Sequence, residues 1–414
     1  MMINKISRGC VLFSAAFLKV FLVALFSSEK KRIELPRRFE EAFARYVGTR
    51  HAIAVSSGTM ALSLCLQALG GQEGDEILVP GYTVTEVIDV ILLYKMRPVF
   101  IDVRIEDGTI DPVYLERMIS ARAKFVLMTH IHGCPCDIAA IETICKKHNL
   151  IIIEDSAQSC GAEYKGKKTG RFGRVGYFSF GIMKNINTLG GGMIVTDDAQ
   201  LAWRIRDITG GFKRLARKEL WLRLAKTMSL SFFTHPVVFS LLVYPLMYLL
   251  GEKRERIFEF LFKAPLLSAE KLDKLKTVFS AEQAALGLFQ LRSLDVFNKA
   301  KMENAELLES CLADCLKVQC IKKRNGRKNI YLNFVVLAQD REKLINRLFL
   351  QGIDVSPGFV MACSDIERFK GFRLDCPNSL SWQEKNIYIP IYPFLSRTKI
   401  IKMADIIKKF YEEK

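Results

Sequence analysis

Between residues 34 and 198 the chain alternates short apolar runs with amphipathic segments, and no other feature restricts the possible folds as strongly. This alternation is typical of an α/β fold in which helices cover both faces of a mostly parallel sheet. In that architecture ligands bind beyond the carboxyl ends of the strands. The predicted strands are 51–55, 76–79, 98–102, 125–129, 150–153 and 193–196, and the predicted helices are 57–69, 83–94 and 139–147.

A run of small residues, Ser-Ser-Gly-Thr at 56–59, joins the first predicted strand to the first predicted helix. The N-terminus of a helix offers free N–H groups and a favourable dipole to an anion, and small residues allow a close approach. The same residues would serve equally well as an ordinary helix cap. The run therefore indicates an anion site only in combination with other groups.

Two charged residues stand where apolar segments end. Asp155 follows a predicted buried strand, and it either caps a helix or requires a cationic partner, because desolvating a carboxylate is costly. Lys184 follows another apolar segment, where it is either solvated or has a lowered pKa and reacts with carbonyls. An anion cradle, a buried carboxylate and such a lysine at strand ends are together what pyridoxal phosphate (PLP) requires.

Longer stretches of sequence carry a more specific signal. They read FEEAFARYVGTRHAIAVSSGTMAL, DEILVPGYT, PVFIDV, THIHGCPCDI, IIIEDSAQSCGAEYKGKKTGRFGRVGYFSFGIMKN, GGGMIVTDD, SAEQAALGLFQL and IYIPIYPFLS. These stretches resemble the DegT/DnrJ/EryC1/StrS family of PLP-dependent sugar aminotransferases. The resemblance implies a fold-type-I PLP-transferase-like large domain with a mostly parallel sheet, together with a smaller C-terminal α+β domain.

The resemblance implies a role for each matching residue. Lys184 matches the catalytic lysine that binds the cofactor covalently, and Asp155 matches the carboxylate paired with the pyridine nitrogen. Gln158 matches the residue near the ring hydroxyl, and Tyr82 matches the aromatic residue that stacks on the ring. The remaining cofactor-binding matches are Ser57, Gly58, Thr59, Ser179 and Asn185.

The resemblance also implies the reaction. An amino donor, glutamate, gives its amino group to the cofactor, and Lys184 moves the proton as a general base and then as an acid. The amino group then passes to a keto sugar on a nucleotide or a lipid, in the biosynthesis of cell-surface polysaccharide or a related product. Family members are typically homodimers. The alternatives are a PLP-dependent sugar dehydratase, in which histidine replaces the lysine, and a catalytically inactive scaffold.

Three positions depart from the family pattern. The histidine expected two residues after Ser179 is Gly181, and the Gly-Glu-Gly-Gly loop reads Leu-Gly-Gly-Gly at 189–192. An Asn-x-Arg segment that usually reaches the neighbouring subunit's phosphate reads Lys-Thr-Val at 276–278. We therefore expect PLP chemistry with an unusual acceptor.

The net charge of +17 is concentrated in one region. Residues 201–276 hold 15 Lys and Arg against 7 Asp and Glu, and they include the 25 residues 227–251, which contain none of these four types. Basic flanks around an apolar segment favour anionic lipid head groups, whereas a nucleic-acid site would intersperse aromatic residues among its charges. We predict contact with a membrane surface and no binding of nucleic acid. The basic flanks are Lys213, Arg214, Arg217, Lys218, Arg223, Lys226, Lys253, Arg254 and Arg256.

Residues 9–28 form a second apolar stretch, interrupted by Lys19 and bounded by basic residues on both sides. No signal-peptide cleavage site follows it, and its length is marginal for a membrane span. Pro236 and Pro245 interrupt the other apolar stretch. We expect interfacial or re-entrant helices at the inner face of the cell membrane; true spans and burial at a subunit interface are the alternatives.

These features divide the chain into four parts. They are an apolar N-terminal membrane-associated segment (1–33), a large PLP-binding domain (34–200), a basic and apolar insertion (201–276), and a connecting helix with a small domain (277–414). The 11 cysteines are too dilute for a disulfide scaffold, and only Cys134 and Cys136 stand one residue apart. We expect reduced thiols in a cytoplasmic protein and no metal site.

Overall fold

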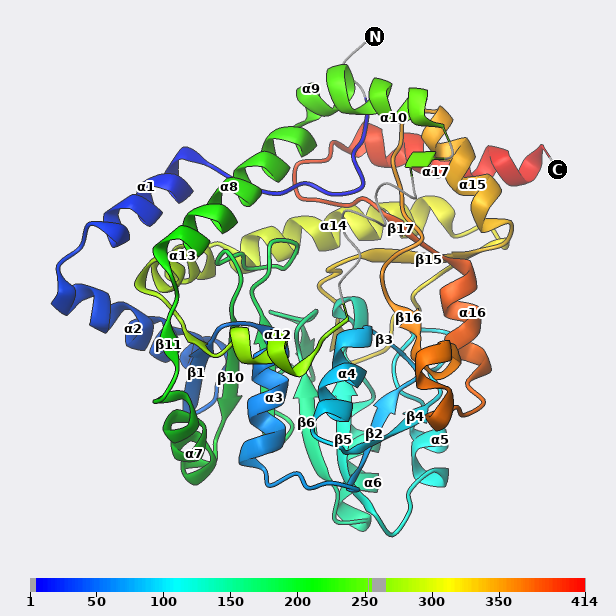
Figure 1. Cartoon of the computed structure of the whole chain (residues 1–414). Coiled ribbons are helices and arrows are strands. Elements are labelled where there is room, and N and C mark those ends of the chain that lie inside the picture. The colour runs from blue at the N-terminus through cyan, green and yellow to red at the C-terminus, as the bar shows by residue number, and fades with distance from the viewer. Residues whose placement is uncertain (1–4, 252, 255–265, 414) are drawn as a thin grey trace.

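The computed structural model of the protein describes residues 5–251, 253–254 and 266–413, so Arg256 lies outside the described residues. In this part of the chain the largest sheet has seven strands, in the order β1-β10-β9-β6-β5-β2-β4 (Figure 1). Only β10 runs antiparallel to its neighbours, and the other pairs are parallel. The strands are β1 (His51–Val55), β2 (Glu76–Pro80), β4 (Arg97–Ile101), β5 (Ala123–Thr129), β6 (Ile151–Asp155), β9 (Val175–Ser179) and β10 (Gly192–Thr196). The mostly parallel α/β sheet predicted from the alternation is confirmed.

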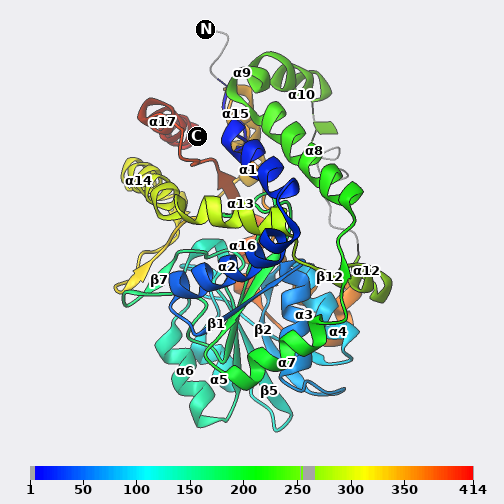
Figure 2. The ribbon, with the colours of Figure 1, turned by 90° about the vertical axis from the view of Figure 1, so that its left-hand side faces the viewer.

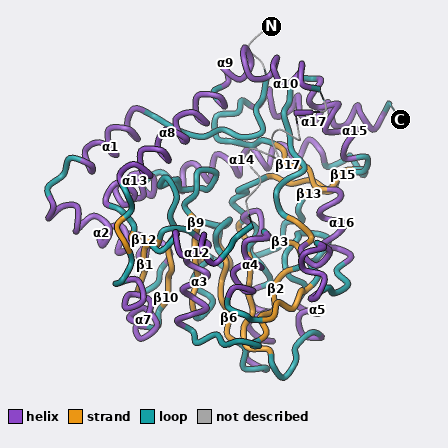
Figure 3. Tube along the Cα trace, viewed as in Figure 1, coloured by secondary structure: helices purple, strands orange, loops and turns teal. Residues whose placement is uncertain are grey.

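Helices bury both faces of this sheet, as Figure 3 shows. Successive residues of a strand point to opposite faces. Ile77 and Val79 of β2 therefore pack with α3 (Gly58–Ala68), α4 (Thr85–Leu93) and α7 (Ala199–Thr209). Leu78 between them packs with α5 (Pro112–Arg117) and α6 (Ile138–Lys147) on the other face. Burial on both faces explains why the strands read as uninterrupted apolar runs.

One predicted helix begins later than its sequence pattern indicated. The pattern predicts a helix from residue 83, but α4 begins at Thr85. Tyr82 and Thr83 instead form the short strand β3, which pairs with β16 (Met361–Ala362). The partner strand lies almost 300 residues away in the sequence, so local periodicity gives no indication of it.

The C-terminal part has its own sheet and core. The strands β13 (Val318–Cys320), β15 (Phe334–Ala338) and β17 (Asn386–Ile389) pair antiparallel. Helices α14 (Leu294–Leu312), α15 (Arg341–Leu350) and α17 (Arg397–Glu412) complete this core. The described N-terminal residues join it, because Ile6 bridges to Ile353 and the Arg8 guanidinium binds the Asp354 carboxylate at 2.7 and 2.9 Å.

The two apolar stretches of the sequence lie together on one side of the molecule (Figures 1 and 2). The first forms α1 (Ala15–Leu25), which precedes α2 (Glu29–Val47). The second lies within α8 (Arg217–Thr234), α9 (Pro236–Val238), the π-helix 239–243 and α10 (Tyr244–Leu250).

Among the described residues no single helix has both the length and the apolar character of a membrane span. Only α8 taken together with residues 236–250 meets that criterion, and the pair is bent by 59°. The bend lies at Pro236, which begins a new helix. Pro245 causes no comparable break: it lies at the start of α10, which directly follows the π-helix 239–243, and residues 236–250 continue as one helix.

Candidate active site

Asp155 is the last residue of β6 and is buried at the carboxyl end of the sheet. Its carboxylate accepts hydrogen bonds from the Ala157 backbone N–H at 3.0 Å and from the Tyr177 hydroxyl. Burial raises the pKa of Asp155, while these hydrogen bonds and the charge of Lys184 lower it. No described helix begins at Asp155, so the helix-cap alternative does not apply.

Lys184 lies in the loop after β9 and is partly buried. Desolvation lowers the pKa of its amine, whereas the charges of Asp155 and Glu86 act in the opposite direction. The charges of Lys184 and Asp155 therefore influence each other, although no ion pair within 4 Å joins the two among the described residues. Gly181 connects this pair to Ser179, because a Cβ at Gly181 would lie 3.8 Å from Lys184 Cγ and 4.0 Å from Ser179 Oγ.

The residues of the predicted anion cradle lie at the N-terminus of α3. Ser57 caps the helix, since its hydroxyl accepts a hydrogen bond from the Met60 N–H at 3.0 Å. Gly58 is the first helical residue, followed by Thr59, and a Cβ at Gly58 would approach Ser179 Cβ to 2.9 Å. The missing side chain lets the helix N-terminus reach Ser179 directly, which fits a small anion such as a phosphate group.

Gln158 is buried and bonds to a residue to which the sequence assigned no role. Its side-chain oxygen accepts a hydrogen bond from the His132 backbone N–H at 3.0 Å. Burial, reinforced by the charge of Lys184, lowers the pKa of His132 to about 3, so its imidazole is neutral. His132 Nδ1 is buried without a hydrogen-bond partner in the described part of the chain. The only sequence signal for this residue was its place inside the stretch THIHGCPCDI.

Two of the predicted cofactor residues bond to residues of the C-terminal part of the chain. Tyr82 has no exposed surface; its hydroxyl accepts a hydrogen bond from Asn386 at 3.0 Å and its ring packs against Trp382. The Tyr82 hydroxyl also lies 3.3 Å from His132 Nε2, so Tyr82 adjoins the contact between His132 and Gln158. Its stacking on a cofactor ring stays a prediction. The Asn185 side-chain amide donates to Asn298 of α14 at 2.7 Å, so it anchors the loop that carries Lys184.

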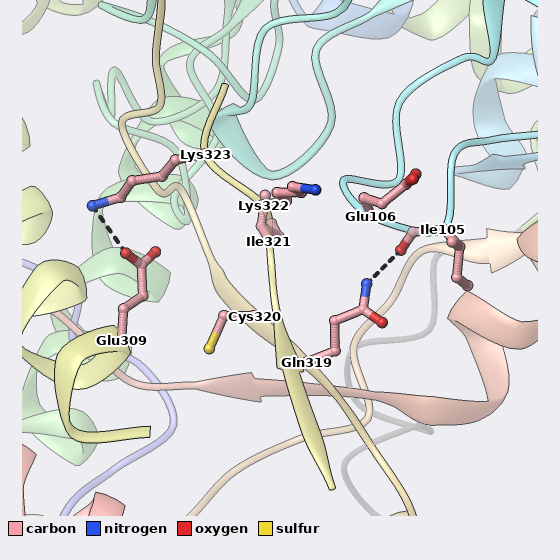
Figure 4. A pocket seen from close by; sticks show the side chains of 8 residues that line it. All are labelled: Ile105, Glu106, Glu309, Gln319, Cys320, Ile321, Lys322 and Lys323. Carbon is pink, nitrogen blue, oxygen red and sulfur yellow. Dashed lines mark hydrogen bonds and ion pairs between the residues drawn. The ribbon is translucent and has the colours of Figure 1, made fainter. Parts of the chain in front are cut away.

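The structure also contains a cavity of about 450 Å³ between the loop after β4, α14 and β13 (Figure 4). The Lys323 ammonium pairs with Glu309 at 2.9 Å there, and the Gln319 amide donates to the Ile105 carbonyl at 3.0 Å. None of the residues predicted to bind the cofactor lines this cavity. The candidate active site is therefore the set of residues around Lys184 and Asp155, and this cavity is separate from it.

Comparison with known proteins shows to which family the chain belongs. The model of the DegT/DnrJ/EryC1/StrS aminotransferase family matches residues 26–226 and 275–408. The chain belongs to this family. It is therefore an aminotransferase, as the motifs predicted. The match leaves out residues 1–25, 227–274 and 409–414. The first two of these segments include α1, the end of α8 and all of α9 to α10.

Relatives extend over nearly the whole length of this family member. It is 29% identical to the GDP-perosamine synthase of Vibrio cholerae, over 93% of this chain and 92% of that protein. It is also 29% identical to an uncharacterized protein of Methanocaldococcus jannaschii, over 91% and 90% of the two chains. The solved aminotransferase from Psychrobacter cryohalolentis has the same fold, with a TM-score of 0.77 at 22% identity and coverage of 97% and 98%.

The close contact between Gly58 and Ser179 predicts an effect on cofactor affinity. Gly58→Ala should push Ser179 away from the helix N-terminus and weaken PLP binding by roughly tenfold, equivalent to about 1.4 kcal/mol. Gly211→Ala is the matched control, because a Cβ there has no neighbour within 4 Å. Fluorescence titration with PLP measures both variants, and equal affinities would refute the assignment of the cradle.

Proposed function

We propose that this aminotransferase uses PLP to move an amino group from glutamate to a keto sugar carried by a nucleotide or a lipid. The observation that carries the proposal is the position of Lys184, which lies near Ser179 and whose charge influences the buried carboxylate of Asp155. The helix N-terminus beside Ser179 supplies an anion cradle next to that lysine. The sugar acceptor is supported by the relatives named GDP-perosamine synthase.

Each residue of the proposed site has a separate task. Lys184 would hold the cofactor at its aldehyde carbon, and Ser57, Gly58, Thr59 and Ser179 would hold the phosphate. Asp155 forms no ion pair within 4 Å among the described residues, and a buried carboxylate requires a cation such as a protonated ring nitrogen. Bound PLP supplies an electron sink for cleavage of the bond to hydrogen at the substrate carbon.

The lowered pKa of Lys184 suits it to proton transfer. Desolvation raises the neutral fraction of its amine, and only the neutral amine can accept a proton. Once the amino donor has released Lys184 from the cofactor, its neutral amine would take the proton from the donor carbon as a base. The resulting ammonium would then give that proton to the cofactor's aldehyde carbon as an acid. Gln158, held by the His132 N–H, would bind the ring hydroxyl and orient the ring.

We also propose that the enzyme is a homodimer that works at the inner face of the cell membrane. The dimer is supported by the family resemblance. The location is supported by the apolar stretches of α1 and α8–α10 and by the basic residues that flank them.

The role of Lys184 is tested by trapping. Borohydride reduction of the PLP-loaded enzyme, followed by peptide mapping, should place the pyridoxyl group on Lys184. Lys301 is a useful internal control, because burial lowers its pKa to about 8 outside the proposed site. Lys184→Ala should slow turnover by at least about 10²-fold, since it removes the proton carrier. A label on Lys301 or any other lysine would overturn the assignment.

A second test concerns Asp155. Asp155→Ala should keep the fold but slow both half-reactions by on the order of 10²-fold, because the ring nitrogen loses its counter-charge. Asp89→Asn is a control, since the buried Asp89 of α4 pairs with Arg368 and, among the described residues, has no hydrogen bond or ion pair to Lys184 or Asp155. Stopped-flow absorbance follows each half-reaction separately. Near-normal rates in Asp155→Ala would contradict the proposed role.

A further inference from the structure

Helices α8 to α10 expose large apolar side chains along their outer side. Six of these residues, which we call the outer row, are Leu222, Phe232, Phe233, Leu242, Leu246 and Leu249, and each is more than half exposed. No Asp, Glu, Lys or Arg interrupts the chain between 227 and 251. Single exposed apolar residues are common, but several large ones along the same run of helices are typical of a binding site for a protein or a membrane.

The inner sides of the same helices are firmly packed. Leu220 and Leu224 of α8 form a buried cluster with Phe17 and Phe21 of α1. At the other end, the Tyr244 ring lies 5.0 Å from the Phe349 ring, and its hydroxyl donates to the Phe349 carbonyl at 2.7 Å. Figure 2 shows these helices as an outer layer over the rest of the molecule. The outer row is thus one side of an anchored layer.

The packed inner side reaches the active-site loop. Leu189 belongs to the cluster of Phe17 and Phe21, and its backbone has a φ of +61°, which a leucine adopts only under constraint from its surroundings. The Arg223 guanidinium of α8 donates to the Leu189 carbonyl at 3.3 Å. It also lies 2.8 Å from the position of a Cβ at Gly190, so the glycine in place of the family's glutamate makes room for α8.

Basic side chains border the outer row. Lys213 and Arg214 of β11, and Arg217 and Lys218 at the start of α8, precede the outer row. Lys226 lies on α8 between Leu222 and Phe232. All five are exposed, and none forms an ion pair within 4 Å in the described part of the chain. Apolar residues bordered by unpaired cations match the interface of a bilayer with anionic head groups.

We infer that the outer row and its basic border bind the surface of an anionic bilayer. This inference rests on the membrane location proposed above and identifies the part of the protein that makes the contact. A second copy of the chain fits less well, because a twofold interface places the same patch against itself and would bring two basic borders together. The 59° bend between α8 and residues 236–250 favours helices that lie in the interface over a straight span. The site loop under α8 is thereby held close to the bilayer.

Vesicle flotation of the full chain tests this inference. The protein should float with vesicles of phosphatidylcholine and phosphatidylglycerol, less with phosphatidylcholine alone, and less at high salt, which screens the head groups. Phe232→Glu/Phe233→Glu should reduce partitioning by at least roughly tenfold, since two charges would enter the apolar interface. The matched control is Val296→Glu/Leu316→Glu, which adds the same charges at exposed apolar positions outside the outer row and should float like the wild type.

The possible outcomes separate the two proposals. Equal flotation of both double variants, or no flotation of the wild type, overturns the lipid surface. An oligomer that the Phe232→Glu/Phe233→Glu variant dissociates, without vesicle binding, overturns it in favour of a second copy. The PLP spectrum and the glutamate half-reaction, measured without vesicles, test the proposed enzyme function independently of any lipid result.

Discussion

The proposed site depends on a buried carboxylate at the edge of a parallel sheet. Asp155 lies opposite Thr129 of β5 and Tyr177 of β9 in the register of the central strands. Removing a carboxylate from water is costly, and here one backbone N–H, the Tyr177 hydroxyl and the nearby charge of Lys184 offset part of that cost. A cationic ring nitrogen would offset the rest of the desolvation cost. The position of Asp155 at the end of β6 would thus place the ring of the cofactor at this edge of the sheet.

The structure explains one of the departures from the family pattern by the packing of neighbouring helices. The loop 189–192 has a leucine and a glycine where the family pattern has a glycine and a glutamate, and both positions lie against α1 or α8. Leu189 fills an apolar cluster with α1 and α8, and Gly190 accommodates Arg223. The segment Lys-Thr-Val at 276–278, which replaces Asn-x-Arg, lies elsewhere. Its residues Thr277 and Val278 form β12, which pairs with β11 (Lys213–Arg214). Nothing in the structure explains Gly181.

Local sequence was sufficient to predict most strands, the cap at Ser57 and the positions of Asp155 and Lys184, because each depends on short-range patterns of polarity and glycine. Contacts between distant segments were not predictable in this way. Tyr82 is an aromatic residue after a strand end, yet Asn386 and Trp382 of the small domain enclose it. Asn185 stands next to Lys184 in the sequence, but its amide bonds to Asn298. His132 contributes through its backbone N–H, a group that no side-chain pattern reveals.

The central claim is that Lys184 and Asp155 form the working centre of a PLP enzyme. The absorbance spectrum of the purified full chain with PLP tests it most directly. The account predicts a visible band from the lysine-bound cofactor, its loss when glutamate is added, and its return when a keto sugar acceptor follows. A folded protein that shows no such band with PLP, or a band that glutamate leaves unchanged, would contradict the account.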